Sequence, residues 1–350
     1  MKHIAQIVII IAVLLTFIGC NMDASEGIFR QISKSEPIVD VGMTTILKIA
    51  NSGTTIYALS SKGGLVRYDV VTKQPVRLDG ESPISQVLVG SNGTDIMYTV
   101  YNGTTWYKLD DSDNPIAQNL PPRQVITTSL YGGWELSRGT ASGSFDLYHD
   151  LTTKVVADLH NTFAAYPWLI AQDTKEAGGI VLVTGLAADS TSNNIKYSHV
   201  LYDSSGNFTT ITPSINNPIV AFAYDKNSEK LVAITSDGKV YGGTKSESGT
   251  TFIMAAGDTT LSFLPNGITG KPIPSFIDST GNLVIQGSSL FYSISPAKVV
   301  TQIQDSYAPS LRSSTFKITS MILDGTDFYG GTAKNGIFKV DLTDDSVDWL

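Results

Sequence analysis

The chain has 350 residues, with 24 Lys and Arg against 32 Asp and Glu, and its formal net charge is −8. A net acidic chain without a cluster of basic residues lacks the electrostatic footprint of a nucleic-acid binder or of a protein that lies flat on anionic lipid. Charged residues make up only 16%, whereas there are 31 glycines and 15 tyrosines, which favours β-sheet over long helices.

The first element in chain order is a short apolar run, Ile4 to Ile18, followed by Gly19 and Cys20, the only cysteine. The run is shorter than the ~20 residues of a transmembrane helix and is typical of a signal peptide. A single cysteine cannot form an internal disulfide, so this placement predicts a lipid anchor. The alternative is an uncleaved signal anchor in which the cysteine is incidental.

The order of residues around Cys20 resembles the lipobox of bacterial lipoproteins, although Phe17 stands where leucine is usual. The resemblance implies that a signal peptide, residues 1–19, is removed and that Cys20 is acylated, for example with palmitate. Several acyl chains anchor a protein stably where one binds only marginally. We therefore expect a lipidated tether over 20–43 and a protein held to a membrane of the cell envelope, periplasmic or surface-exposed, through its N-terminal lipid.

A repeat of about 40 residues follows. The segments Ala50–Asp69 and Leu323–Asp341 share one plan, namely an apolar strand, a Gly turn, a Tyr-bearing strand, a second Gly turn and a strand that ends in Asp. Turns such as Asn335-Gly336 supply the positive φ that tight hairpins require. The approximate units are 44–80, 85–120, 124–162, 164–215, 218–259, 273–305 and 317–350.

Units of this length with four short strands are typical of propeller blades. The sequence therefore predicts an all-β domain over 44–350, a β-propeller of about seven four-stranded antiparallel blades, with six or eight as alternatives. The ring closes either by direct packing of the last blade on the first or through an added outer strand from Ile28–Ile32.

The blade core, Asp324-Gly325 through Lys339, resembles a broad set of bacterial propellers. The plan is also similar to that of the propeller lipoprotein of the outer-membrane β-barrel assembly machinery, which implies a non-catalytic scaffold. The run Thr99–Trp106 partly resembles the Asp-box of sialidases, but the six arginines are scattered. A fold of this kind hosts unrelated activities, so function has to come from a site.

Motifs for catalysis, metals and cofactors are missing from the sequence. His149, His160 and His199 are scattered, and we interpret the first two as ordinary surface or turn residues. The carboxylate groups at 110–113 and 341–345 lack the spacing of a calcium loop, so we interpret them as solvated turn residues. We expect no cofactor and no metal.

Aromatic residues suggest both packing and a binding loop. Four tyrosines at matching blade positions predict packing between blades, and the fourth unit carries the longest polar loop, Leu186 to Lys196. We place a partner-binding loop there and interpret the chain as a protein-binding or scaffold module rather than an enzyme. The alternative is a glycan-directed hydrolase or lyase with carboxylates at the channel mouth. The packing residues are Tyr57, Tyr98, Tyr241 and Tyr329, and the loop residues are Trp168, Asp189, Asn193 and Asn194.

Overall fold

The structure is a computed structural model, and it describes residues between 45 and 350. The gaps within this range are 53–54, 62–63, 72–74, 79–83, 90–94, 101–104, 111, 122, 129–132, 141–143, 158, 160–164, 172–179, 189–194, 213–214, 226–227, 262–271, 288–290, 304, 306–310 and 312–316. Cys20, the predicted tether and Ile28–Ile32 lie outside the described residues.

The strands follow one another as antiparallel meanders of four, as the repeat predicted. The first half of the chain contributes β1 (Ile46–Ser52), β2 (Thr55–Ser60), β3 (Leu65–Asp69), β4 (Pro75–Arg77), β5 (Ile84–Val89), β6 (Ile96–Val100), β7 (Trp106–Leu109), β8 (Pro115–Ala117), β9 (Val125–Thr128), β10 (Trp134–Arg138), β11 (Phe145–His149), β12 (Thr153–Val156), β13 (Ala165–Ala171) and β14 (Ile180–Ala188).

The second half continues the same order without a break in the pattern. It contributes β15 (Ile195–Asp203), β16 (Phe208–Thr212), β17 (Ile219–Asp225), β18 (Lys230–Thr235), β19 (Lys239–Lys245), β20 (Thr251–Thr260), β21 (Ser275–Ile277), β22 (Leu283–Gln286), β23 (Phe291–Ile294), β24 (Val300–Gln302), β25 (Ile318–Asp324), β26 (Asp327–Thr332), β27 (Ile337–Asp341) and β28 (Ser346–Trp349).

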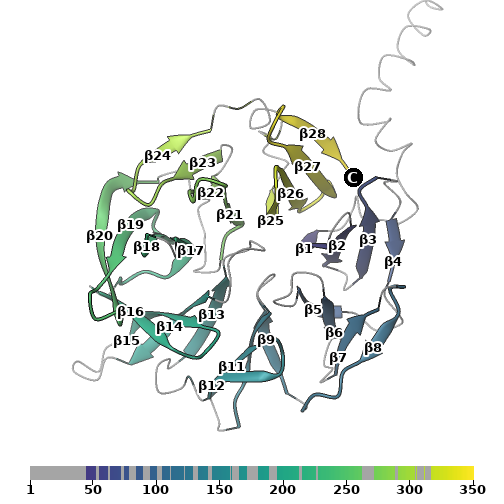
Figure 1. Ribbon diagram of the computed structural model, residues 1–350, viewed down its shortest axis with the longest axis horizontal. Helices are drawn as coiled ribbons and strands as arrows, with labels where there is room; N and C mark the ends of the chain where they lie inside the picture. Colours follow the sequence, from purple (N-terminus) through teal and green to yellow (C-terminus); the bar gives the residue numbers. More distant parts are fainter. Residues whose placement is uncertain are drawn as a thin grey trace, which may run out of the picture.

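The meanders stand around a central opening, with strands such as β1, β5, β9 and β25 toward the centre and β4, β8, β12 and β28 toward the rim (Figure 1). The prediction of an all-β, propeller-like ring is confirmed. Because each meander is antiparallel, its hairpin between second and third strands lies at the same end of the ring as the connections between meanders. We call this end the link face and the opposite end the turn face.

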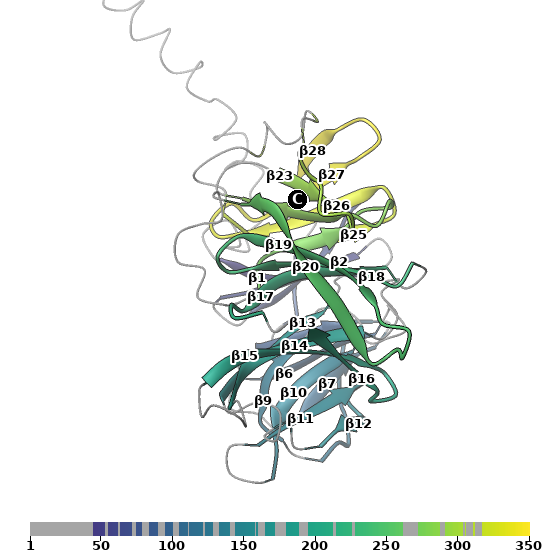
Figure 2. The same cartoon turned by 90° about the vertical axis from the view of Figure 1, so that its left-hand side faces the viewer.

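One pair of neighbouring meanders is fused. In the described residues the strands form five four-stranded sheets and one eight-stranded sheet, in which β13–β16 and β17–β20 join through a parallel pairing of β16 with β20. Thr210 pairs with Thr251 and Thr212 with Ile253. Figure 2 shows the long β20 running down to β16 along the outside of the ring.

The ring closes by direct contact between the first and last meanders. The hydroxyl of Thr45 donates to the Ala333 carbonyl at 2.9 Å, and Asn51 donates to the Asp324 carboxylate at 2.5 Å. A Cβ on Gly331 would lie 2.6 Å from the Ile46 side chain, so only glycine fits this approach. Direct packing, one of the two predicted modes of closure, is therefore present.

Apolar clusters link each meander to the next. One cluster joins the last, first and second meanders through Ile322, Ile49 and Val87, and five others join the remaining neighbours. Burial of this apolar surface is the main stabilising term, because each sheet face alone would leave it in water. Removing one meander would expose two such faces.

The predicted packing of tyrosines between blades is confirmed for all four residues, since Tyr241 packs against the cluster that joins the fourth and fifth meanders. Tyr57, Tyr98 and Tyr329 belong to the cluster that joins the last, first and second meanders. Their positions in the strand register do not match fully. Tyr57 and Tyr329 each pair with the residue two positions before the Asp that ends the third strand, whereas the partner of Tyr98 lies three positions before the corresponding Asp. The position of Tyr241 within its blade was predicted wrongly, since it lies on a third strand, β19, where it is half-buried.

Buried hydroxyls close the hairpins at the link face. Thr99 donates to the Thr105 carbonyl at 3.0 Å, Thr235 to Lys239 at 3.1 Å and Thr332 to Gly336 at 2.9 Å. Each hydroxyl donates to a backbone carbonyl at the end of the strand pair. The short side chain takes the place of water as the hydrogen-bond partner of that carbonyl. This recurring Ser or Thr was not among the features predicted for the repeat.

Candidate functional site

The fourth meander carries the longest hairpin in the described part of the chain. β14 and β15 have nine residues each and stay paired from Ile180 with Asp203 to Ala188 with Ile195. The second strands β2, β18 and β26 end at a Ser or Thr of the link face, but β14 continues for four residues beyond Thr184. The hairpin therefore projects from the link face.

This hairpin occupies the place of the predicted binding loop. The loop prediction was wrong in its bounds, because residues 186–188 and 195–196 pair as strands and only 189–194 connect them. Asp189, Asn193 and Asn194 lie outside the described residues. The backbone of Trp168 lies in β13, where it pairs with Thr184 at the base of the hairpin.

A buried histidine supports the base of the hairpin. His199 Nδ1 lies 2.7 Å from the Thr184 hydroxyl, and Nε2 lies 3.2 Å from the Ile215 carbonyl. Burial lowers the pKa of His199 to about 4, so the ring is neutral near pH 7. The ring of Tyr197, two residues toward the tip, stacks on it with centroids 6.4 Å apart. His199 therefore has a structural role.

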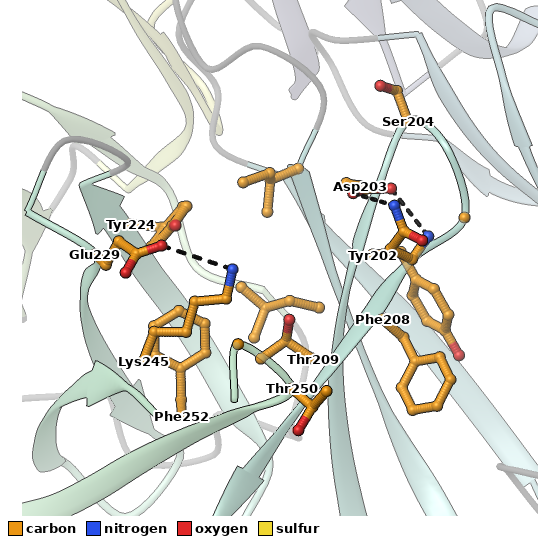
Figure 3. A pocket seen from close by; sticks show the side chains of 15 residues that line it. Tyr202, Asp203, Ser204, Phe208, Thr209, Tyr224, Glu229, Lys245, Thr250 and Phe252 are labelled. Atoms are coloured by element: carbon orange, nitrogen blue, oxygen red, sulfur yellow. Dashed lines mark hydrogen bonds and ion pairs between the residues drawn. The ribbon is translucent and has the colours of Figure 1, made fainter. Parts of the chain in front are cut away.

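A second feature of this region is a pocket at the turn face, between the fourth and fifth meanders. Its volume is about 810 Å³. Figure 3 shows Tyr224, Glu229 and Lys245 on one side of this space, Asp203 on the other, and Thr209 between them. We call it the fourth–fifth pocket.

Its floor is apolar and its walls are polar. Leu201 and Phe252 are buried in the cluster shared by the two meanders, and Tyr224 meets Phe252 edge to face with centroids 5.5 Å apart. Lys245 Nζ lies 3.7 Å from Glu229 Oε1. Burial raises the pKa of Tyr224, with smaller contributions from Glu229 and Asp225, so its hydroxyl stays protonated.

A corresponding pocket lies between the first and second meanders, with a volume of about 530 Å³. Here charged and polar side chains bridge the two meanders. Arg67 forms an ion pair with Asp113, and the Tyr57 hydroxyl donates to the same carboxylate at 3.1 Å. Burial, followed by the Asp113 charge, raises the pKa of Tyr57 to about 12, so Tyr57 is a hydrogen-bond donor and no nucleophile.

Ion pairs between second and third strands recur around the ring. Lys108 lies 2.6 Å from Asp95 and Lys339 lies 2.8 Å from Asp327, both diagonal across the strand pair, whereas Lys245 lies directly opposite Glu229. Their recurrence shows that the pair itself belongs to the blade. The fourth–fifth pocket differs in two respects. Its Lys–Glu distance is longer than the Lys–Asp distances of the other pairs, and its volume is larger than that of the pocket between the first and second meanders.

The predicted turn carboxylates behave as turn residues. Asp110 accepts hydrogen bonds from the backbone N–H groups of Ser112 and Asn114 at 2.9 and 2.8 Å, and Asp341 accepts one from Thr343 at 2.8 Å. These bonds lower the pKa of both carboxyls. A glycosidase acid requires the opposite shift. Among the described residues there is no group of three or more His, Cys, Asp or Glu placed to hold a metal ion.

One histidine prediction was wrong. His149 ends β11, as predicted, but its side chain is only 14% exposed and its ring lies 4.7 Å from that of Trp134. Nearby, Arg123 and Glu135 form a buried ion pair at 2.6 Å, and Arg123 also donates to the Leu151 carbonyl. Packing within the third meander accounts for both features. His160 lies outside the described residues.

No family model matches this chain, and neither does any curated protein. Solved structures do match. PorZ, an essential surface component of the type-IX secretion system of Porphyromonas gingivalis, is 10% identical with a TM-score of 0.53 over 88% of this chain, and the match spans only 38% of PorZ.

Two further structures represent different functions. KlAtg21 in complex with the coiled coil of AgAtg16 is 10% identical over 85% of this chain and 94% of its own, with a TM-score of 0.53. A catalytically inactive virginiamycin B lyase from Staphylococcus aureus with quinupristin is 10% identical over 87% and 97%, with a TM-score of 0.52. At this identity the similarities establish the β-propeller fold alone.

The structure also bears on membrane insertion. Among the residues that it describes, no helix is long and apolar enough to cross a membrane.

Proposed function

We propose that this protein is a lipid-anchored, non-catalytic β-propeller that binds a protein partner in the cell envelope. The projecting hairpin β14–β15 carries the proposal, because it is the feature that departs most from the repeat. Propellers bind through the loops and hairpins of their faces, since the blade sides are buried against neighbours. KlAtg21, whose structure holds a coiled-coil partner, is a protein of the same fold.

We also propose that the ring has seven blades, with the eight-stranded sheet contributing two. Each half of that sheet is a complete antiparallel meander, and only the short parallel pairing of β16 with β20 joins them. The boundaries 1–19 for the signal peptide, 20–43 for the tether and 44–350 for the ring belong to the same proposal.

Attachment rests on Cys20. A Cys20→Ala variant should be released from the membrane fraction or remain an unprocessed precursor. Detergent partitioning and intact mass measure this. A wild-type protein whose mature form lacks acyl mass on Cys20 would contradict the anchor.

Binding is tested by replacing 189–194 with Asn-Gly. Ala188 and Ile195 are already paired, so a two-residue turn closes the hairpin without strain. We expect an unchanged melting temperature and loss of the partner that copurifies with the wild type. As a matched control, Lys334-Asn335 at the tip of the β26–β27 hairpin is replaced by Asn-Asp, which should retain the partner.

The alternative, a glycan-directed hydrolase or lyase, would place its carboxylates at the channel mouth. The two pockets described above lie between neighbouring meanders toward the turn face, and the resolved pKa shifts of Asp110, Asp237 and Asp341 are downward. Both observations favour binding over acid catalysis. Turnover of a glycan substrate by the purified protein would reverse this preference.

A further inference from the structure

The fourth–fifth pocket has the size and composition of a ligand site. Its volume of about 810 Å³ falls in the usual range for pockets that bind small molecules, roughly 300 to 1,000 Å³. Such sites combine an apolar surface with a few well-placed polar groups. The pocket has both, and it lies at the opposite end of β14 and β15 from the projecting tip on which the proposed partner binding rests.

The apolar part offers a ring face and aliphatic side chains. Tyr224, Ile180 and Leu201 line the pocket beside the buried Phe252. An aromatic side chain presents a flat face with a polar tip, which suits ligands that have one apolar and one polar side. The Tyr224 hydroxyl stays protonated and can both donate and accept.

The polar part carries charged and neutral donors and acceptors. Lys245 and Glu229 bring one positive and one negative group 3.7 Å apart, and Asp203, Ser204, Thr209 and Thr250 also line the pocket. Glu229 is 58% exposed and Lys245 26%, so both can reach a ligand. A hydroxyl donates one bond and accepts two, and an ammonium group only donates.

These groups disfavour the common anionic ligands. A phosphate needs a surplus of positive charge or a cradle of N–H groups, whereas the one lysine that lines the pocket already contacts a carboxylate. An extended peptide would add to a strand edge, but β16 and β20 pair with each other across the rim of the pocket. Both carboxylates that line the pocket already have partners, since Asp203 accepts from the Ser205 and Asn207 N–H groups and Glu229 faces Lys245. The pocket therefore favours a neutral ligand with many hydroxyl or amide groups and an apolar face.

We infer that the fourth–fifth pocket binds a short neutral oligosaccharide. A pyranose ring has an apolar C–H face that can lie on Tyr224, and its hydroxyls match the mixed donors and acceptors of the walls. The pocket is large enough for more than one ring.

The test is calorimetric titration of the full chain with chitotriose and cellotriose as neutral probes, a trigalacturonate as acidic probe and capped trialanine as peptide probe. We expect at least one neutral trisaccharide to bind with a Kd of about 1 mM or tighter, and the other two probes to bind more weakly. Lys245→Met should weaken the neutral trisaccharide roughly tenfold, because it removes a charged donor.

Lys108→Met is the matched control, since it removes the corresponding lysine from the pocket between the first and second meanders. It should leave binding of the neutral trisaccharide unchanged. Ligand-induced change in melting temperature, measured on each variant, shows that the variant is folded and reports binding independently. Equal loss in both variants, failure of every neutral trisaccharide to bind, or tighter binding of the peptide or acidic probe would overturn the assignment.

Discussion

Two junctions of the ring solve the same packing problem differently. Between the first and second meanders, Arg67 and Tyr57 reach across to Asp113 and bridge the pocket with polar contacts. Between the fourth and fifth, Leu182 and Leu201 pack on apolar residues, and the parallel pairing of β16 with β20 holds the rim. A blade junction can therefore be held mainly by apolar packing and strand pairing, and the pocket at that junction is the larger of the two, about 810 Å³ against about 530 Å³.

The largest effect should come from the apolar junction. Phe252 is 2% exposed and lies in the cluster shared by the fourth and fifth meanders. Phe252→Ala should lower the free energy of unfolding by about 3 to 5 kcal/mol, since it removes buried apolar contacts and leaves a cavity. Urea denaturation measures this. A loss below about 1 kcal/mol would show that the parallel strand pairing, and not the apolar cluster, holds the junction.

The second effect is a pH dependence confined to the same junction. His199 has a pKa of about 4 in the folded protein against about 6.5 unfolded, so the unfolded chain binds the proton first as the pH falls. Its stabilising contribution is complete above pH 6.5 and should fall by about 2 kcal/mol between pH 7 and pH 5. His199→Gln should lose less stability over this range than the wild type, and parallel curves would refute the assigned burial effect.

Breaking the polar contacts between the first and second meanders should lower the free energy of unfolding by less. Asp113 has a φ of 64°, which asparagine tolerates, so Asp113→Asn removes the ion pair with Arg67 without adding backbone strain. Because Arg67 is a third exposed, we expect a loss of about 1 kcal/mol, smaller at high salt. A loss that matches Phe252→Ala would erase the distinction between the two junctions.

The smallest effects concern the recurring ion pairs. Lys245→Met and Lys108→Met should each change the free energy of unfolding by less than about 0.5 kcal/mol, since both pairs are solvent-accessible. Thermal denaturation of both variants checks this. A larger loss for Lys245 alone would assign it a structural role and remove it from the pocket experiment.

The repeat was readable from the sequence because strand chemistry is local. Turns such as Asn335-Gly336 mark strand ends directly, and the third strands end in residues such as Asp203 and Asp341 that cap the next turn. The fused sheet was not readable, since the parallel pairing of Thr210 with Thr251 joins residues 41 apart through an ordinary Thr-rich strand.

The sites were also harder to predict, because they depend on contacts between residues that are distant in the sequence. The hairpin was recognised from its length, but a run of polar residues hid how far β14 and β15 extend. The fourth–fifth pocket was missed because its lining comes from hairpins of two meanders, and Glu229 and Lys245 look like ordinary surface charges in the sequence. Tyr241 was misplaced because one tyrosine in a strand does not reveal which of two adjacent strands carries it.

The central claim, that a protein partner binds at the projecting hairpin, is tested most directly by site-specific photo-crosslinking in intact cells. A benzoylphenylalanine side chain is placed at Tyr197 on the hairpin and, for comparison, at the exposed Thr301 of β24 on the rim. We predict one discrete adduct with a single protein from position 197 and none from position 301. An adduct from position 301 alone, or none from either, would contradict the account.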